Sequence, residues 1–90
     1  MSGMESKVGT VVISKAGRDK GKWMAVLQIS GDHVLVIDGK ERPIERPKRK
    51  NIKHLAPTRY EVSQYDMMFN SRLKRALYLL SVTEEKREGS

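Results

Sequence analysis

Three short runs of β-branched and aliphatic residues fill much of the first 40 positions, and glycine-containing turns separate them. The runs are residues 8–13, 23–29 and 33–37, and each has the length and composition of a strand. Ser30-Gly31-Asp32 forms a tight turn between the last two. No helical periodicity occurs before residue 60. This pattern predicts a mainly β fold for the first two thirds of the chain.

Asp38-Gly39 follows the third run and is typical of a two-residue type I′ turn, because both central positions of that turn need a positive φ. The pair predicts a short fourth strand over residues 40–44, antiparallel to the third. Pro43 and Pro47 confine this strand to a brief ladder or to an edge of the sheet.

Ile52 and Leu55 are expected to dock inward, either as a short fifth strand or as a single 3₁₀ turn. Five short strands with one long basic loop predict a small barrel of the SH3-like type. We expect this barrel to occupy residues 7–59.

The last third of the chain has a different period. Apolar residues recur at spacings of three and four, which predicts an amphipathic helix over residues 71–83, with Asn70 or Ser71 as its N-cap and residues 84–90 frayed. Strands that are apolar on both faces need a cover, so the connector and helix of residues 60–90 are expected to pack on the barrel. Self-association of the helix is the alternative. The apolar face consists of Leu73, Ala76, Leu77 and Leu80.

The positive charge of the chain is concentrated in the part with the β pattern. The 90 residues include 18 Lys and Arg against 11 Asp and Glu, a formal net charge of +7. Residues 1–60 hold 13 of the basic and 6 of the acidic side chains, whereas residues 61–90 hold equal numbers of each. This distribution predicts a polyanionic partner, either nucleic acid or an anionic membrane surface. An idle solvated surface is the alternative.

Candidates for catalysis and for metal binding fail on residue type or spacing. Gly17 and Gly21 are one residue too close for a phosphate-binding P-loop, and Trp23 stands where that loop needs Ser or Thr. No cysteine and only two histidines leave no zinc site and no nucleophile with its base. The apolar runs are far shorter than a membrane span requires. We therefore expect a soluble, cytoplasmic, non-enzymatic protein without a cofactor, metal ion, membrane span or small-molecule substrate.

Two basic clusters are candidates for phosphate contacts. In residues 15–22, two glycines let the backbone approach a phosphate closely. In residues 46–53, five cations repel one another unless a polyanion or solvent screens them. A solvated connector is the alternative for the first cluster, and a nuclear localisation tract for the second. The candidate RNA-binding residues are Lys15, Arg18, Lys20, Lys22, Arg46, Lys48, Arg49, Lys50, Asn51, Lys53 and His54.

Two residues of the first cluster and its border are expected to be structural. Asp19, the single acidic residue of the loop, is expected to order it through contact with a neighbouring cation. Trp23, the only tryptophan, is expected to pack in the small core. Stacking of Trp23 on an unpaired base is the alternative.

Residues 11–22, VVISKAGRDKGK, resemble the KOW motif of ribosomal proteins and NusG-type transcription factors. Met24 stands where many KOW motifs have a second glycine. Two further stretches point to one family among the proteins with this motif. They are Val34-Leu35-Val36 with Asp38-Gly39, and residues 48–58, KRKNIKHLAPT. Over residues 7–59 the chain resembles the archaeal and eukaryotic large-subunit ribosomal protein family "L-fourteen-e" and its short bacterial KOW relatives.

This resemblance implies an SH3-like KOW barrel whose loops bind structured ribosomal RNA. It implies a ribosomal or ribosome-associated ribonucleoprotein of the large subunit, active in translation. A NusG-like protein-interaction module in transcription or translation is the first rival, and a protein that binds DNA or a membrane surface is the second. The resemblance gives an RNA-facing role to Arg18, Lys20, Lys22, Lys48, Arg49, Lys50, Asn51, Lys53 and His54.

Overall fold

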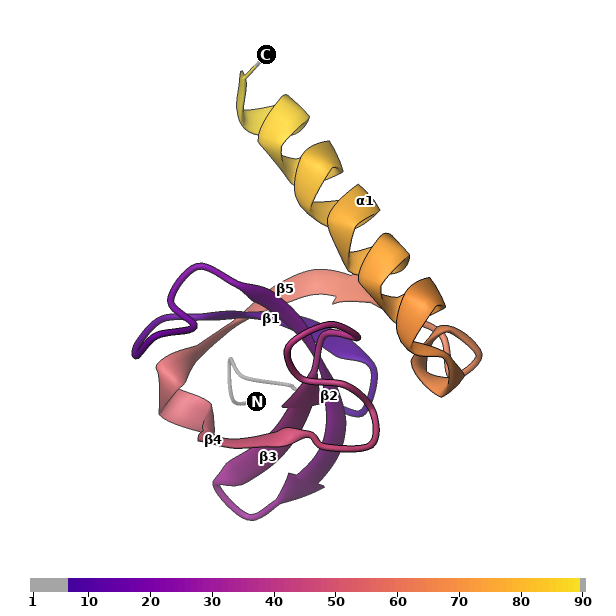
Figure 1. Cartoon of the computed structure of the whole chain (residues 1–90). Helices are drawn as coiled ribbons and strands as arrows, with labels where there is room; N and C mark the ends of the chain where they lie inside the picture. Colours follow the sequence, from indigo (N-terminus) through magenta and orange to yellow (C-terminus); the bar gives the residue numbers. More distant parts are fainter. Residues whose placement is uncertain (1–6, 90) are drawn as a thin grey trace.

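One five-stranded antiparallel sheet and one long C-terminal helix make up the computed structural model, which describes residues 7–89, with side chains as far as Lys86 (Figure 1). The strands lie in the order β4-β3-β2-β1-β5. The expected mainly β fold of about five strands with a C-terminal helix is thus confirmed, as an open sheet. Its strands are β1 (Thr10–Ser14), β2 (Trp23–Ser30), β3 (His33–Ile37), β4 (Lys48–Asn51) and β5 (Leu55–Glu61).

The sheet is curled (Figure 1). Its two edge strands, β4 and β5, follow each other in the sequence. The single 3₁₀ turn η1 (Ile52–His54) joins β4 to β5. Its first amide, Ile52 N, donates to Asp32 O in the β2–β3 turn at 2.9 Å. The expectation that Leu55 docks inward is confirmed, since it is 3% exposed. Because β5 pairs only with β1, Pro57 lies in an edge strand, where a missing amide hydrogen costs little.

The predicted two-residue hairpin at Asp38-Gly39 is wrong. Residues 38–47 form a loop without a strand, and the partner of β3 is β4, which begins at Lys48. The carboxylate of Asp38 accepts hydrogen bonds from Lys40 N and Arg42 N, both at 2.8 Å. These bonds satisfy the amides that a strand ladder would have used, so the side chain of Asp38 builds a wider turn.

Alternate residues of the central strands belong to two separate hydrophobic clusters, one on each face of the sheet. Val12 packs on the concave side with residues of β2, β3 and β5. Val11, its neighbour, packs on the other side with Leu73 and Leu77 of the helix. The helix thus covers the second face of the sheet, as predicted from strands that are apolar on both sides.

The C-terminal elements are longer than the sequence predicts. β5 runs to Glu61, beyond the expected limit of the barrel at residue 59, and a second 3₁₀ turn, η2 (Asp66–Met68), lies in the connector. The helix α1 (Asn70–Gly89) continues past the expected end at residue 83, while Ser90 lies outside the described residues. Two side chains of β5 contact Glu84, one residue past the expected end, and so connect this part of the helix to the sheet.

The sequence predicts that the side chain of Asn70 caps the helix, but the structure shows this side chain bonded to another segment. Its side-chain oxygen accepts from Ile44 N at 2.8 Å, and its amide nitrogen donates to Glu45 at 3.0 Å. Asn70 therefore fastens the loop of residues 38–47 to the start of α1. The hydrogen bond from Asn70 lowers the pKa of Glu45.

Candidate nucleic-acid interface

The loop between β1 and β2, residues 15–22, is closed by backbone hydrogen bonds. Ser14 N donates to Lys22 O at 3.0 Å, and Gly21 N donates to Ser14 O at 2.8 Å. Gly17 and Gly21 have φ values of +80° and +88°, in the region that L side chains rarely adopt. The backbone of the loop is thereby fixed. Its side chains Lys15, Arg18 and Lys20 are exposed.

Asp19 fastens this loop to two segments that are distant in sequence. Its side chain is 10% exposed, with Oδ2 at 3.5 Å from the ammonium of Lys50 and Oδ1 at 3.8 Å from the guanidinium of Arg42. Lys50 belongs to β4 and Arg42 to the β3–β4 loop. The prediction that Asp19 contacts a cation is confirmed, but the expected neighbouring cation is wrong, since both partners come from elsewhere in the chain.

The side chain of Lys50 is buried and makes only internal contacts. Its Nζ also donates to Ser14 Oγ at 2.9 Å and to Ala16 O at 3.3 Å, and its side chain is 8% exposed. With three acceptors around it, the ammonium has its three donors occupied. Lys50, a candidate RNA-binding residue, therefore holds the loop against β4 and is unavailable to a phosphate.

The basic run in β4 is divided between the two faces of the strand, because successive side chains of a strand point to opposite sides. Lys48 and Lys50 are paired with Val36 and Val34 of the concave cluster, and Lys48 is half-buried. Arg49 points the other way and is exposed. Lys48 is thus on the side of the loop of residues 15–22, and Arg49 is not.

The segment after β4 ends beside the first loop. Asn51 caps η1, since its Oδ1 accepts from Lys53 N at 3.0 Å. His54 O accepts a hydrogen bond from Lys15 N at 2.8 Å. The side chains of Lys53 and His54 are exposed. Two basic clusters that are separate in the sequence are therefore neighbours in the fold.

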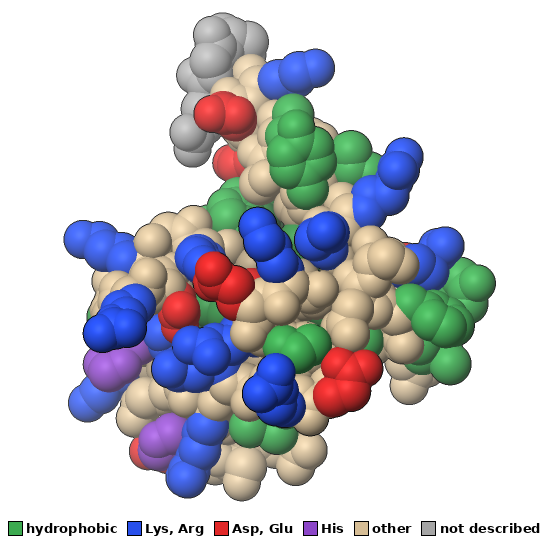
Figure 2. Space-filling view, in the orientation of Figure 1, with side chains coloured by type: hydrophobic (Ala, Val, Ile, Leu, Met, Phe, Trp, Pro, Cys, Tyr) green, Lys and Arg blue, Asp and Glu red, His purple; other side chains and the backbone are tan. Residues whose placement is uncertain are grey.

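Most of the candidate cations have no carboxylate partner among residues 7–86. Lys22 is an exception besides Lys50, because its ammonium pairs with Glu41, and this hydrogen bond raises the pKa of Lys22 and lowers that of Glu41. Figure 2 shows Lys and Arg side chains over much of this face of the molecule, with acidic side chains among them. Arg46 and Arg49 are exposed but are not joined to the first loop by any described contact. The group that the fold joins is here called the basic surface: Lys15, Arg18, Lys20, Lys48 and Lys53.

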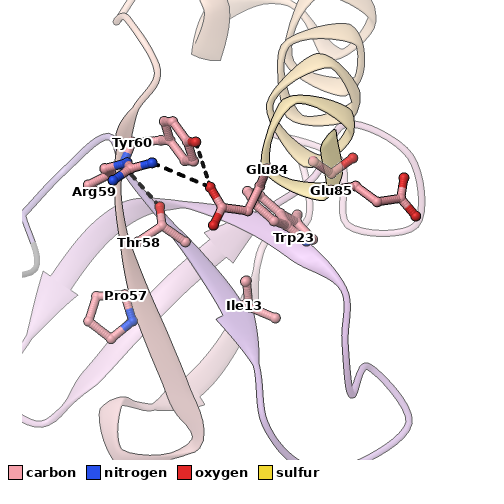
Figure 3. Close-up of a pocket in the computed structure, with 9 residues that line it drawn as sticks. Ile13, Trp23, Pro57, Thr58, Arg59, Tyr60, Glu84 and Glu85 are labelled. Atoms are coloured by element: carbon pink, nitrogen blue, oxygen red, sulfur yellow. Dashed lines mark hydrogen bonds and ion pairs between the residues drawn. The ribbon is translucent and has the colours of Figure 1, made fainter. Parts of the chain in front are cut away.

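A groove of about 790 Å³ lies between β5 and the C-terminal half of α1 (Figure 3). Trp23 and Tyr60 form its aromatic wall, with ring centroids 6.2 Å apart, and both pack against the core cluster under the helix. The hydroxyl of Tyr60 donates to Glu84 at 2.7 Å, and Arg59 lies 3.7 Å from the same carboxylate. With Glu84 and Glu85 along it, this groove does not continue the basic surface.

Sequence reasoning missed two cations that the fold brings into this region. Arg42 contacts Asp19, and Lys40 is exposed in the same loop. Both lie within residues 40–44, where Asp38-Gly39 predicts a strand instead of a loop. No local signal marks Arg42 as a partner of Asp19, because their contact depends on how the loop of residues 38–47 folds back.

Within residues 7–86, no group of three or more His, Asp and Glu side chains is placed to hold a metal ion. Neither the α-helix nor the short turns of the described chain are long and apolar enough to cross a membrane. A comparison with models of known protein families finds no match for this sequence.

Proposed function

We propose that this protein binds structured RNA, that this RNA is ribosomal RNA of the large subunit, and that the protein has no enzymatic activity. The observation that carries the proposal is the joint at Asp19, which holds the loop of residues 15–22 against β4. Because of this joint, exposed cations from two parts of the chain lie in one region, and the carboxylate that joins these parts is itself nine-tenths buried. Such a surface suits the repeating charge of a phosphate backbone.

In this proposal the exposed ammonium groups and Arg18 neutralise phosphates and release the counterions condensed on the RNA. The guanidinium of Arg18 is able to hold a phosphate through two parallel hydrogen bonds. His54 adds a ring with two nitrogen atoms for hydrogen bonds at the end of the surface, where it is exposed. Lys50 and Asn51 act indirectly, since one fastens the loop and the other caps η1.

The proposal also takes the curled sheet as a KOW-type, SH3-like barrel, and places the protein in the cytoplasm as a ribosomal or ribosome-associated protein. The position of the basic loop between the first two strands and the curl of the sheet support this (Figure 1). So does the resemblance of residues 7–59 to the L-fourteen-e family.

The salt dependence of binding tests the proposal. A fragment of large-subunit ribosomal RNA is titrated with the protein between low and moderate salt, alongside duplex DNA of equal length and anionic vesicles. Arg18→Ala with Lys20→Ala should weaken RNA binding and flatten the slope of log K against log salt by about 1.5, at roughly 0.7–0.9 for each phosphate contact. The matched control removes two exposed lysines outside the basic surface, Lys7→Ala with Lys86→Ala, and should leave the slope unchanged.

Equal effects of the two double variants would contradict the proposal, because the position of the charges would then not matter. Tighter binding to the DNA or to the vesicles would contradict the choice of RNA. In cell extracts the native protein should sediment with large ribosomal subunits at moderate salt and leave them at high salt. A partner that stays bound after nuclease treatment would instead support the protein-interaction module.

A further inference from the structure

A second groove, of about 400 Å³, lies where the basic loop meets the helix. The end of the loop of residues 15–22 forms one side of it, the loop of residues 38–47 another, and one flank of α1 the third. On that flank Lys74 and Tyr78 are one turn apart, so their side chains lie on the same side of the helix. The groove therefore begins beside the basic surface and ends at an aromatic ring.

The two carboxylates of this groove already have partners. Asp38 accepts from two backbone amides of its own loop, at 2.8 Å each. Glu41 pairs with Lys22, which keeps the pKa of Glu41 below its usual value. Lys40 and Lys74 are exposed and have no carboxylate partner among residues 7–86. The groove thus presents two available ammonium groups to an anion.

Tyr78 gives the groove a second kind of contact. It is 64% exposed, although the same helix buries Leu77, the preceding residue, at 4%. An exposed ring beside ammonium groups is the arrangement with which proteins hold single-stranded nucleic acid, because each base stacks on the ring while its phosphate meets the cations. A paired base keeps its faces within the duplex stack and cannot reach such a ring.

We propose that this groove holds an unpaired nucleotide of the RNA that the basic surface binds. The base stacks on Tyr78, and Lys40 and Lys74 contact the adjacent phosphates. This inference rests on the proposed function and narrows it, since the preferred RNA then has a bulge or loop beside a paired stem. Figure 2 shows basic side chains continuing from the loops to the base of the helix, along the path such an RNA would take.

Two RNA hairpins test the inference, one fully paired and one with a single unpaired nucleotide in the stem. The protein should bind the bulged hairpin about 5- to 150-fold more tightly, the range that one stacked base gives. Tyr78→Leu should abolish this preference and leave the affinity for the paired hairpin unchanged, whereas Tyr78→Phe should keep it. Leu79→Ala is the control, because Leu79 is an exposed apolar residue of the same helix, 50% exposed, outside the groove.

Trp23 provides an independent readout. It is the only tryptophan of the chain and lines this groove, so its emission should change with the bulged hairpin and not with the paired one. A wild-type protein without preference for the bulge, or a preference that survives in Tyr78→Leu, overturns the inference. In both cases salt-dependent binding of the paired hairpin still supports the basic surface. If neither hairpin binds, the proposed function fails and the inference fails with it.

Discussion

The ammonium of Lys50 lies 3.5 Å from the carboxylate of Asp19, 31 residues earlier in the chain, and both side chains are about nine-tenths buried. Lys50 lies in the middle of a basic run of the sequence, yet its side chain is buried and connects β4 to the loop of residues 15–22. Its charge does not add to the basic surface but determines where the loop of residues 15–22 is held. The function proposed for the exposed cations depends on this buried pair.

The first prediction concerns that pair. Lys50→Met should lower the free energy of unfolding by about 3 kcal/mol, because it leaves the buried carboxylate of Asp19 short of a partner. Lys53→Met, at an exposed lysine in the same segment, should change it by less than about 0.5 kcal/mol. Urea unfolding of both variants measures the difference. Equal midpoints would mean that the Lys50–Asp19 contact does not stabilise the fold.

The packing of the helix gives the second prediction. Leu77 is buried against Val11 and Ile37, so Leu77→Asp should cost roughly 2–4 kcal/mol through the lost apolar contact and the buried charge. Leu79→Asp adds the same charge two residues further along, at a half-exposed position, and should cost much less. Thermal unfolding compares them. If both variants melt like the wild type, α1 does not pack on the sheet in solution.

The two-sided core could be predicted from sequence because it depends on local periodicity. Val11 and Val12 are adjacent apolar residues of one strand, so both faces of the sheet had to be covered, and the helical spacing of Leu73 and Leu77 supplied the cover. The ends of the helix could not be predicted in this way. Past Thr83 the helix is in contact with β5 through Glu84, whose partners are more than 20 residues away in the chain.

The loop of residues 38–47 shows the opposite case, in which a strong local signal misleads. Asp38-Gly39 fits a tight hairpin, and Gly39 does have a positive φ of 79°. The side chain of Asp38 instead bonds to two later amides, and Asn70 holds the loop from the helix. Which cations of the candidate site are exposed also depends on such long-range contacts, as Lys50 demonstrates.

Gly39 gives the third prediction. A Cβ atom there would overlap the carbonyl oxygen of Asn70 and lie 3.0 Å from Lys74 N, both backbone atoms of the helix. Gly31 has a similar φ of +62° but nothing within 4 Å of its Cβ position. Gly31→Ala should therefore cost only the strain of a left-handed residue, about 1 kcal/mol or about 4–8 °C in melting temperature. Gly39→Ala should lower the melting temperature by at least about twice as much, and equal shifts would contradict the close approach of loop and helix.

The final prediction is a gain of affinity at Glu41. Its carboxylate occupies the ammonium of Lys22 beside the basic surface, so Glu41→Gln should free Lys22 for a phosphate. RNA should then bind more tightly at low salt, and the slope of log K against log salt should steepen by about 0.7–0.9, as expected for one more contact.

Acidity provides a check on the Glu41 variant. The hydrogen bond with Lys22 lowers the pKa of Glu41 from its ordinary value of 4.5. The ion pair is therefore complete above pH 4.5 and is lost only as the pH falls through the lowered pKa. The affinity ratio of Glu41→Gln to wild type should therefore stay constant from about pH 8 to pH 5, the interval in which Glu41 remains ionised. A ratio that falls to one within this interval would mean that Glu41 loses its charge there.

Glu61→Gln is the matched control, because it removes the same charge and frees Lys7, its partner at 3.1 Å, three residues before β1 begins. Lys7 is not part of the basic surface, so this variant should leave the salt slope of RNA binding unchanged. A steeper slope in both variants would show that binding follows the net charge of the protein. A steeper slope in Glu41→Gln alone would place Lys22 beside the bound phosphates.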